Sequence, residues 1–212
     1  MGLVFLLFGP PGVGKTLTAE ATCEYLKKPL YNISVCDLGI NPENMQIIMD
    51  KIIEYVDRWD AIMLIDEVDI FVEERQFAHV TRNALVSTFL KFLEYNNGII
   101  FLTTNRLNTI DSAVRSRINV FVCYKKLDYK VRKNIWISLL KKWDIELKKA
   151  TVNTLAKSEL NGREMRNYMR LIISIHKDRK LELTDESILK IFDEYNELTD
   201  EFNKSFAASM YT

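Results

Sequence analysis

The chain is poor in the residues that build disulfide-stapled or zinc-bound scaffolds. Its 212 residues include three cysteines, Cys23, Cys36 and Cys123, and two histidines, His79 and His176. The cysteines lie far apart, no CxxC pair occurs and neither histidine is close to a cysteine, so neither a disulfide framework nor a zinc site is expected. Cys23 falls in a predicted helix and is expected to be a packing residue. This cysteine usage favours an intracellular, reducing compartment, with the cytoplasm as the first expectation and the nucleus or mitochondrion as alternatives.

Net charge and long apolar runs are lacking as well. The 29 lysines and arginines balance the 29 acidic residues, which argues against nucleic acid or an anionic membrane as an obligatory partner. No apolar run reaches the roughly 20 residues that span a bilayer. The first apolar run, Leu3–Phe8, is short and follows no basic residue, so it does not resemble a signal peptide. Because the chain starts directly on this run, we expect it to be a fragment of a longer protein.

Glycine is scarce too, but three of the seven glycines lie in one short run, GPPGVGKT, at residues 9–16. The run fits GxxxxGK[ST], a phosphate-binding loop, and stands between the predicted strand Leu3–Phe8 and a helical segment, Leu17–Leu26. In that context backbone N–H groups converge on an anion, and the helix N-terminus adds positive potential. The residues expected to hold a nucleotide are Gly9, Pro10, Pro11, Gly12, Val13, Gly14, Lys15, Thr16 and Leu17.

Two side chains of this run have separate expected tasks. Lys15 would reach the outer phosphates, and the Thr16 hydroxyl would ligate a magnesium ion that the phosphates also hold. The alternative is a glycine-rich turn without a ligand, which the strand–loop–helix context disfavours.

Continuous apolar runs alternate with helical patterns up to about residue 125, which predicts a parallel sheet covered on both faces. One helix is expected to start with Asn41 as its cap and Pro42 at its first position, and another to cover about residues 81–94. The predicted strands are Leu3–Phe8, Leu30–Val35, Ala61–Ile65, Ile99–Thr103 and Asn119–Cys123. The inward residues predicted for the two helices are Met45, Ile48, Ile52 and Val56, and Leu85, Phe89, Phe92 and Leu93.

After residue 125 the strand pattern stops and four helical segments follow, which predicts a second, all-helical domain over residues 126–212. The segments are expected to start near Asp128, Val152, Asn161 and Thr184, and the tail 200–212 is helical or frayed. The first segment is expected to bury Val131, Ile135, Leu139 and Trp143. The tryptophans Trp59, Trp136 and Trp143 fit helix cores and require no ligand.

Polar residues at two strand ends extend the candidate site. The run Ala61–Ile65 is followed by Asp66 and Glu67, and the run Ile99–Thr103 by Thr104 and Asn105. At the carboxyl end of a parallel sheet such residues lie beside the phosphate loop. Asp66 would hold the magnesium ion through water, Glu67 would act as general base on the attacking water, and Asn105 would orient that water. The alternative for each group is a polar strand exit.

This combination resembles an AAA ATPase, within the wider AAA+ class, and the resemblance covers nearly the whole chain. The stretches GLVFLLFGPPGVGKTLTAEA, RNALVSTFLKFLEY, IIFLTTNR and SRI are similar to those of little-characterised fungal-type AAA ATPases. The resemblance implies a five-stranded parallel sheet in the order 5-1-4-3-2, followed by a small helical lid domain. It also implies ATP and Mg²⁺ as ligands, and a homo-oligomer, most often a hexameric ring in the family, that acts on a protein substrate.

The family also implies roles for residues outside the loop. Lys15 and Thr16 match the Walker A pair, Asp66 and Glu67 match Walker B, and Asn105 matches sensor 1. Ser116-Arg117 stands where the family places an arginine finger that reaches the neighbouring subunit's γ-phosphate, with Arg115 as a second candidate; the alternative is a solvated basic turn. Arg163, in Asn161-Gly162-Arg163, matches sensor 2 of the lid, whereas Arg166 and Arg170 are expected to be surface charges.

Two departures from the family qualify the expected function. Many members that thread polypeptide carry an aromatic residue and a glycine after the second strand, but this chain has Leu38 before Gly39, which puts processive threading by that route in question. The family's adenine-enclosing segment before the first strand is also missing from these residues, so weak nucleotide affinity is expected of them alone.

Three functions remain open from the sequence. The leading hypothesis is Mg²⁺-dependent ATP hydrolysis at a subunit interface that remodels a protein or complex. The second is a nucleotide-gated assembly switch or scaffold, which the presence of both Glu67 and Arg117 disfavours. The third is a nucleic-acid motor or clamp-loader relative, which the neutral charge disfavours.

Overall fold

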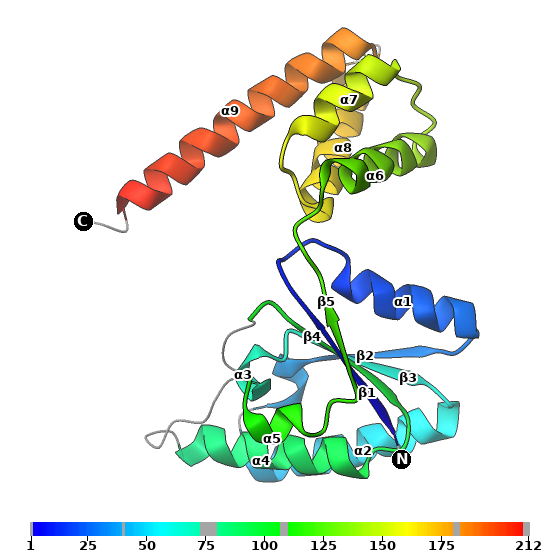
Figure 1. Ribbon diagram of the computed structural model, residues 1–212, viewed down its shortest axis with the longest axis vertical. Helices are drawn as coiled ribbons and strands as arrows, with labels where there is room; N and C mark the ends of the chain where they lie inside the picture. The colour runs from blue at the N-terminus through cyan, green and yellow to red at the C-terminus, as the bar shows by residue number, and fades with distance from the viewer. Residues whose placement is uncertain (1, 40, 73–79, 107–109, 180–182, 210–212) are drawn as a thin grey trace. The chain divides into compact units, whose positions relative to one another are not determined.

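The computed structural model describes residues 2–39, 41–72, 80–106, 110–179 and 183–209, and Figure 1 shows the arrangement of their helices and strands. The chain divides into two compact units, Met1–Lys125 and Lys126–Thr212. Each unit has a hydrophobic core of its own.

The first unit is built on a five-stranded sheet in the order β2-β3-β4-β1-β5. All neighbouring strands run parallel, so the predicted fold class and strand order are confirmed. The central strands are continuous apolar runs because both of their faces are covered. The strands are β1 Leu3–Phe8, β2 Leu30–Ser34, β3 Ile62–Asp66, β4 Ile99–Thr104 and β5 Val120–Cys123.

Helices cover the two faces of this sheet (Figure 1). Helix α1, Lys15–Leu26, packs Ala19 and Cys23 against one face, and burial raises the pKa of the Cys23 thiol, as expected of a packing cysteine. Helices α2, Pro42–Trp59, and α4, Val80–Tyr95, cover the other face. Three shorter elements complete the unit: the 3₁₀ turn η1 Val35–Leu38, α3 Asp69–Val72 and α5 Ser112–Arg115.

The two long helices of the second face follow the predicted patterns closely. The Asn41 side chain accepts a hydrogen bond from the Glu43 N–H and caps α2, with Pro42 at the first helical position. The inward residues predicted for α4 are all buried; on α2, Met49 is fully buried where Ile48 is only partly so. The three short elements were not predicted, since four residues carry too little periodicity to register.

The register of the sheet aligns the chain segments that follow β1, β3 and β4. Phe8 lies beside Thr104, and Ser34 lies beside Asp66. The loops that leave the carboxyl ends of these strands therefore open at one edge of the sheet, where ligands of parallel α/β sheets gather.

The described part of the second unit consists of four helices: α6 Tyr129–Lys142, α7 Lys149–Lys157, α8 Gly162–Arg179 and α9 Asp185–Ser209. Its core centres on Trp136, Tyr168 and Phe192, whose rings meet edge to face at centroid distances of 5.0–6.2 Å. None of the helices in the described parts of the chain is long and apolar enough to pass through a membrane.

The buried face predicted for α6 is wrong at both ends. Val131 is 41% exposed and Trp143 is 43% exposed, whereas Trp136 and Leu140 are buried and Ile135 and Leu139 flank them. A residue four positions along a helix lies about 40° further around the helix axis. Four residues spaced in this way therefore cover about 120°, which is wider than the buried face of α6.

The expectation for Trp59 is wrong as well. Its side chain is 54% exposed and lies on the surface against Tyr55 and Tyr31, with ring centroids 5.5 and 6.0 Å away. As the last residue of α2, Trp59 lies beside the edge strand β2, where one side of the helix faces solvent.

One carboxylate of the second unit links two helices. Asp185, in the first turn of α9, accepts hydrogen bonds from the Lys148 N–H at 3.0 Å and from the Thr151 hydroxyl, at the start of α7. These hydrogen bonds hold the pKa of Asp185 below its usual range, and the bond from Thr151 has the larger effect. A carboxylate with a lowered folded-state pKa stabilises the fold above its unfolded pKa, and this contribution is lost as the pH falls through the folded value.

We therefore expect Asp185→Ala to lower the melting temperature at pH 7 by about 2–5 °C, since the start of α7 loses both hydrogen bonds that link it to α9. The difference from the parent should begin to shrink as the pH falls below about 4, the ordinary pKa of an aspartate, and should continue to shrink as the pH falls through the lowered folded-state pKa. Thermal unfolding followed by circular dichroism measures both effects. Asp178→Ala, at an exposed position of α8, is the matched control; an equal loss in both variants at every pH would contradict the prediction.

Candidate active site

The carboxyl-end edge of the sheet brings together side chains that are up to 90 positions apart in the chain. The Lys15 ammonium donates to the Asn105 side-chain oxygen at 2.8 Å, and to the carbonyl oxygens of Gly9 and Pro10 at 2.8 and 2.7 Å. Lys15 is only 8% exposed. The lysine predicted to hold phosphate and the amide predicted to orient water are therefore direct neighbours.

The start of α1 is arranged to receive an anion. Gly14 precedes the helix with φ of +102°, a left-handed conformation that favours glycine. Within the described residues no side chain caps α1, in contrast to α2 with Asn41 and α6 with Asp128, and the first turn carries no acid. The N–H groups of the turn thus face the loop without a competing carboxylate, as a phosphate site requires. Leu17, in the same turn, is 55% exposed.

Oxygen ligands for a cation lie next to the loop. The Thr16 hydroxyl lies 3.2 and 3.3 Å from the two carboxylate oxygens of Asp66, at the end of β3. A hydroxyl and a carboxylate are hard oxygen donors, and Mg²⁺ takes one or two such protein ligands together with phosphates and waters. The chemistry of the pair predicted to hold Mg²⁺ therefore fits that ion.

Glu67 follows Asp66 in an unusual backbone conformation. Its φ is +57°, in the left-handed region that few residues other than glycine adopt and that costs about 1 kcal/mol or more. Its N–H donates to the Thr103 hydroxyl at 3.0 Å, and the same hydroxyl donates to Asp66. Thr103 is buried, so one threonine of β4 fixes the backbone of one acid and the carboxylate of the other.

Sequence reasoning missed a third acid of the site, Asp69. Its carboxylate accepts from the Thr104 hydroxyl and, at 3.3 Å, from the Asn105 N–H. Asp69 thus holds the end of β4 at the point where Asn105 turns toward Lys15. The sequence signal was present, since Asp69 stands two residues after Glu67, at the start of a helix too short to predict.

We expect Asp69→Ala to reduce ATP turnover about tenfold, because Asn105 loses the backbone contact that orients it. The nucleotide affinity should change by less than about threefold, since the loop and Thr16 are unaffected. Steady-state ATPase assays and titration with a fluorescent ATP analogue separate the two. Asp57→Ala, at an exposed position on α2, is the control; equal losses of affinity and turnover would remove Asp69 from this positioning role.

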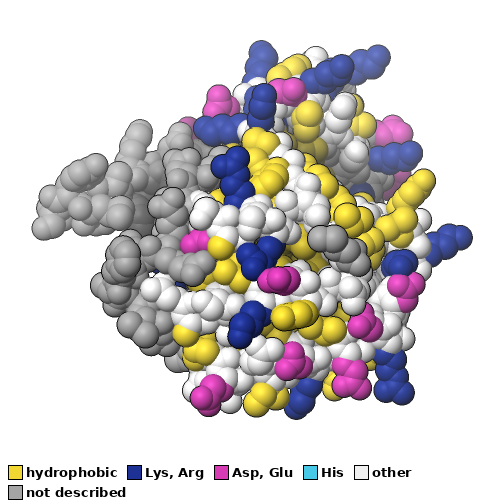
Figure 2. All heavy atoms as spheres, turned by 60° about the horizontal axis from the view of Figure 1, so that its bottom comes forward, with side chains coloured by type: hydrophobic (Ala, Val, Ile, Leu, Met, Phe, Trp, Pro, Cys, Tyr) yellow, Lys and Arg dark blue, Asp and Glu magenta, His cyan; other side chains and the backbone are white. Residues whose placement is uncertain are grey.

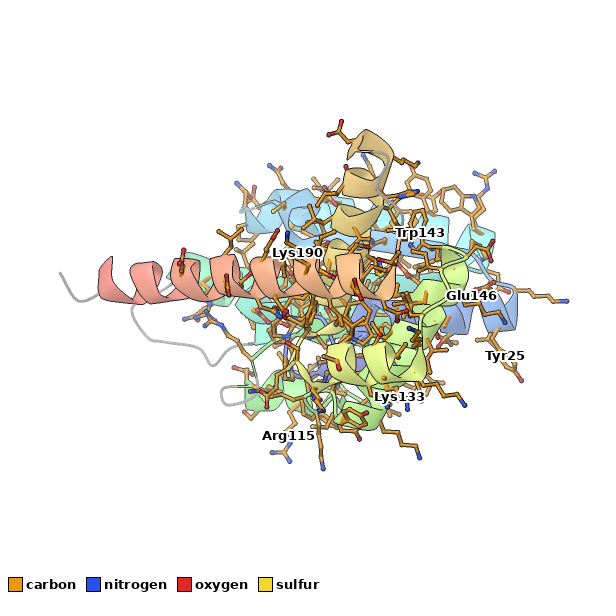
Figure 3. The ribbon with its side chains drawn as sticks, turned by 90° about the horizontal axis from the view of Figure 1, so that it is seen from above. Tyr25, Arg115, Lys133, Trp143, Glu146 and Lys190 are labelled. Atoms are coloured by element: carbon orange, nitrogen blue, oxygen red, sulfur yellow. The ribbon has the colours of Figure 1, made fainter. Side chains whose placement is uncertain are left out.

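The two candidate finger arginines differ in their surroundings. Arg117 pairs with Glu94 at 2.8 Å and donates to the Ala113 carbonyl oxygen at 3.0 Å. Arg115, at the end of α5, is exposed, and its side chain extends outward from the protein (Figure 3). Of the two guanidinium groups, Arg115 is therefore the one directed toward solvent, whereas Arg117 is held against its own subunit by Glu94.

Two further predicted positions lie apart from this cluster. Arg163 belongs to the second unit, exposed in the first turn of α8, where Asn161 and Glu164 form a reciprocal cap; its sensor role stays a prediction. Leu38, which stands where threading members of the family carry an aromatic residue, is fully buried in the core of the first unit. Its side chain packs inside the protein and in this state offers no surface to a substrate.

The fold and this cluster define a nucleotide-binding protein of the phosphate-loop class. More specifically, the chain belongs to the ATPase family associated with various cellular activities (AAA), whose family model matches residues 5–125, more than half of the chain. The predicted family is thereby confirmed.

Relatives agree with this assignment. The ATP-dependent zinc metalloprotease FtsH of Lachnoclostridium phytofermentans is 32% identical over 123 residues, which are 51% of this chain and 21% of that protein. An uncharacterised AAA domain-containing protein of Schizosaccharomyces pombe is 31% identical over 121 residues, 52% of this chain and 16% of that protein. The chain therefore spans about a fifth or less of these two relatives.

Among solved structures, a chain of the HORMA:CdnC:Trip13 complex of Escherichia coli MS115-1 superposes with a TM-score of 0.70 at 22% identity. The match covers 90% of this chain and 73% of that one. At this identity the likeness supports the fold alone.

Proposed function

We propose that the chain is the ATP-hydrolysing core of a machine that remodels a protein or a protein complex. The observation that carries the proposal is the convergence of Lys15, Thr16, Asp66 and Asn105 at one edge of the sheet. A phosphate loop alone would support only binding. Two candidate Mg²⁺ ligands, a candidate base and a water-orienting amide beside the loop support hydrolysis.

Each residue has one task in this proposal. Lys15 and the N–H groups at the start of α1 bind the outer phosphates, and Thr16 and Asp66 hold Mg²⁺, which neutralises charge on the phosphates. Asn105 orients a water molecule. Glu67 takes up the proton of that water as it attacks. Arg163 is proposed to report the state of the nucleotide to the helical lid domain.

The proposed output is mechanical work on a protein. FtsH is by name an ATP-dependent protease, and the structural neighbour comes from a complex with other proteins; both favour a protein target. Nucleic acid is disfavoured by the balanced charge and by the described part of the face in Figure 2, where acidic and basic side chains are interspersed. We propose an intracellular setting, because the three separated cysteines fit a reducing compartment.

Hydrolysis is proposed to need a neighbouring subunit in a ring, most simply a hexamer. An arginine from that neighbour would supply positive charge where the transition state of phosphoryl transfer is most negative. Arg117 occupies the family's finger position, and it would have to exchange its Glu94 carboxylate for the neighbour's γ-phosphate. Arg115 already points outward and is the second candidate.

Mixing two inactive variants tests this arrangement. Arg117→Ala should keep ATP binding but lower turnover about 10²–10³-fold, and Lys15→Ala should keep its arginines but bind little ATP. In a 1:1 mixture, about a quarter of the interfaces in a random ring pair an intact site with an intact finger, so turnover should return to about that fraction of the parent's. The same mixture with Arg115→Ala in place of Arg117→Ala tests whether Arg115 acts on the neighbouring subunit. Arg58→Ala, at an exposed position on α2, is the control and should keep the turnover of the parent.

Two results would contradict the proposal. If the mixture shows no recovery of ATP turnover, Arg117 does not act on the neighbouring subunit's nucleotide. Full turnover by an Arg117→Ala, Arg115→Ala double variant would remove both residues from it.

A further inference from the structure

Tyr124, the residue directly after β5, touches the phosphate loop region from outside the family's motifs. Its N–H donates to the Phe8 carbonyl oxygen at 2.8 Å, at the last residue before the loop. Its hydroxyl donates to the Thr18 hydroxyl at 2.6 Å, in the first turns of α1. The side chain therefore connects the exit of β5 to the helix that follows the loop.

The backbone of Tyr124 also lies against the first residue of the loop. A Cβ atom placed on Gly9 would lie 2.2 Å from the Tyr124 carbonyl oxygen and 2.9 Å from its Cβ, and the φ of Gly9 is +144°. Only glycine fits so close to another chain segment. Because the Gly9 carbonyl oxygen also accepts from the Lys15 ammonium, Tyr124 adjoins a residue that positions the phosphate-binding lysine.

The hydroxyl contact continues into the loop itself. Thr18 accepts from Tyr124 and donates its own proton to the Gly14 carbonyl oxygen at 3.0 Å. Gly14 immediately precedes the helix whose N–H groups face the phosphates. Two hydrogen bonds in series thus run from Tyr124 to the loop, and Tyr124 stands one residue before the end of the first compact unit.

We propose that Tyr124 is a positioning residue that fixes the phosphate loop to the segment leaving the first unit, so that nucleotide binding orders both together. This inference rests on the proposed function, since it requires a nucleotide in the loop. Phe8 and Gly9 lie at the start of the loop and Gly14 and Thr18 near its end, and Tyr124 contacts or is linked to each of them. Such contacts lower the ordering cost of binding, because they reduce the conformational freedom that the loop has to lose.

The test compares variants of the full-length protein that lack one end of the hydroxyl pair. Tyr124→Phe should raise the Kd for a non-hydrolysable ATP analogue with Mg²⁺ by about three- to tenfold, the effect of one hydrogen bond. Thr18→Val should raise it by at least as much, because it also loses the hydrogen bond to the Gly14 carbonyl oxygen. The double variant should lose no more than Thr18→Val alone, because that variant already removes the contact that Tyr124→Phe removes. Tyr129→Phe and Thr154→Val, which remove hydroxyl hydrogen bonds in the second unit, are the matched controls and should bind as the parent does.

Hydrogen exchange gives a readout that a merely structural role would not move. In the parent, the analogue should slow exchange in the first turn of α1 and in residues 122–127 together. In Tyr124→Phe, protection should persist in α1 and be lost from 122–127. Should Tyr124→Phe fail to fold, Thr18→Val decides the same question.

The possible outcomes distinguish failure of the positioning role from failure of the proposed function. A lower melting temperature with unchanged Kd and unchanged protection overturns the positioning role while the proposed function stands. Additive losses in the double variant overturn it as well. A parent protein that binds no ATP analogue overturns the proposed function, and this inference with it.

Discussion

Lys15→Ala is expected to weaken ATP binding about 10- to 100-fold and to abolish measurable turnover at ordinary ATP concentrations. The lysine contributes charge-assisted hydrogen bonds to phosphate, which are worth about 1.5–3 kcal/mol each, and alanine offers neither charge nor donor. The structure adds a second cause. The same ammonium joins the carbonyl oxygens of Gly9 and Pro10 to Asn105, so its removal also breaks the side-chain link between the loop and Asn105.

Titration with a fluorescent ATP analogue and a steady-state assay of the assembled protein measure the two losses. Lys91→Ala, an exposed lysine on α4, controls for the loss of a positive charge. The melting temperature without nucleotide shows whether the variant still folds. A Lys15→Ala protein that binds and hydrolyses ATP as the parent does would remove the phosphate loop from the function, and the family's chemistry with it.

The main features of the first unit are predictable because they depend on short-range patterns. Buried parallel strands are continuous apolar runs, and the five predicted runs match the five strands to within one residue at each end. The phosphate loop is local in sequence as well, so its residues can be identified from the amino-acid sequence alone. What the strand pattern alone could not give is the strand order; the resemblance to a family supplied it, and the structure agrees.

The parts that the sequence did not predict depend on contacts between distant segments. Glu67 stands in a left-handed conformation because Thr103 of β4 holds its N–H, and no local pattern shows that a glutamate will adopt it. Asp69 becomes part of the site only through Thr104 and Asn105. Likewise, the pairing of Arg117 with Glu94 joins α4 to the segment after α5.

Errors of helix orientation have a different origin. The buried stripe of α6 is set by the rings of Tyr168 and Phe192, which pack on Trp136, and both lie far along the chain. Several lines of apolar residues on α6 were compatible with burial, and the partner helices select one of them. Tertiary packing therefore decides the face of a helix whose own pattern is weak.

Glu67→Gln should separate binding from chemistry at this site. The amide has nearly the shape of the carboxylate, so the backbone conformation of residue 67 and its contact with Thr103 are expected to remain. An amide does not take up the proton of the attacking water, and loss of a general base costs about 10²–10⁴-fold in rate. Turnover should fall by that factor while ATP affinity stays within about threefold of the parent's.

The same variant decides between the two leading functions. If ATP hydrolysis drives remodelling, Glu67→Gln should hold ATP, favour the assembled state that ATP stabilises, and fail in the cellular task of the protein. If ATP binding alone sets assembly, the variant should assemble and still perform that task. Size-exclusion chromatography with light scattering, with and without Mg²⁺-ATP, measures assembly, and Glu24→Gln on the exposed side of α1 is the control. Undiminished hydrolysis by Glu67→Gln would exclude Glu67 as the base, and the strained backbone at the end of β3 would then require another explanation.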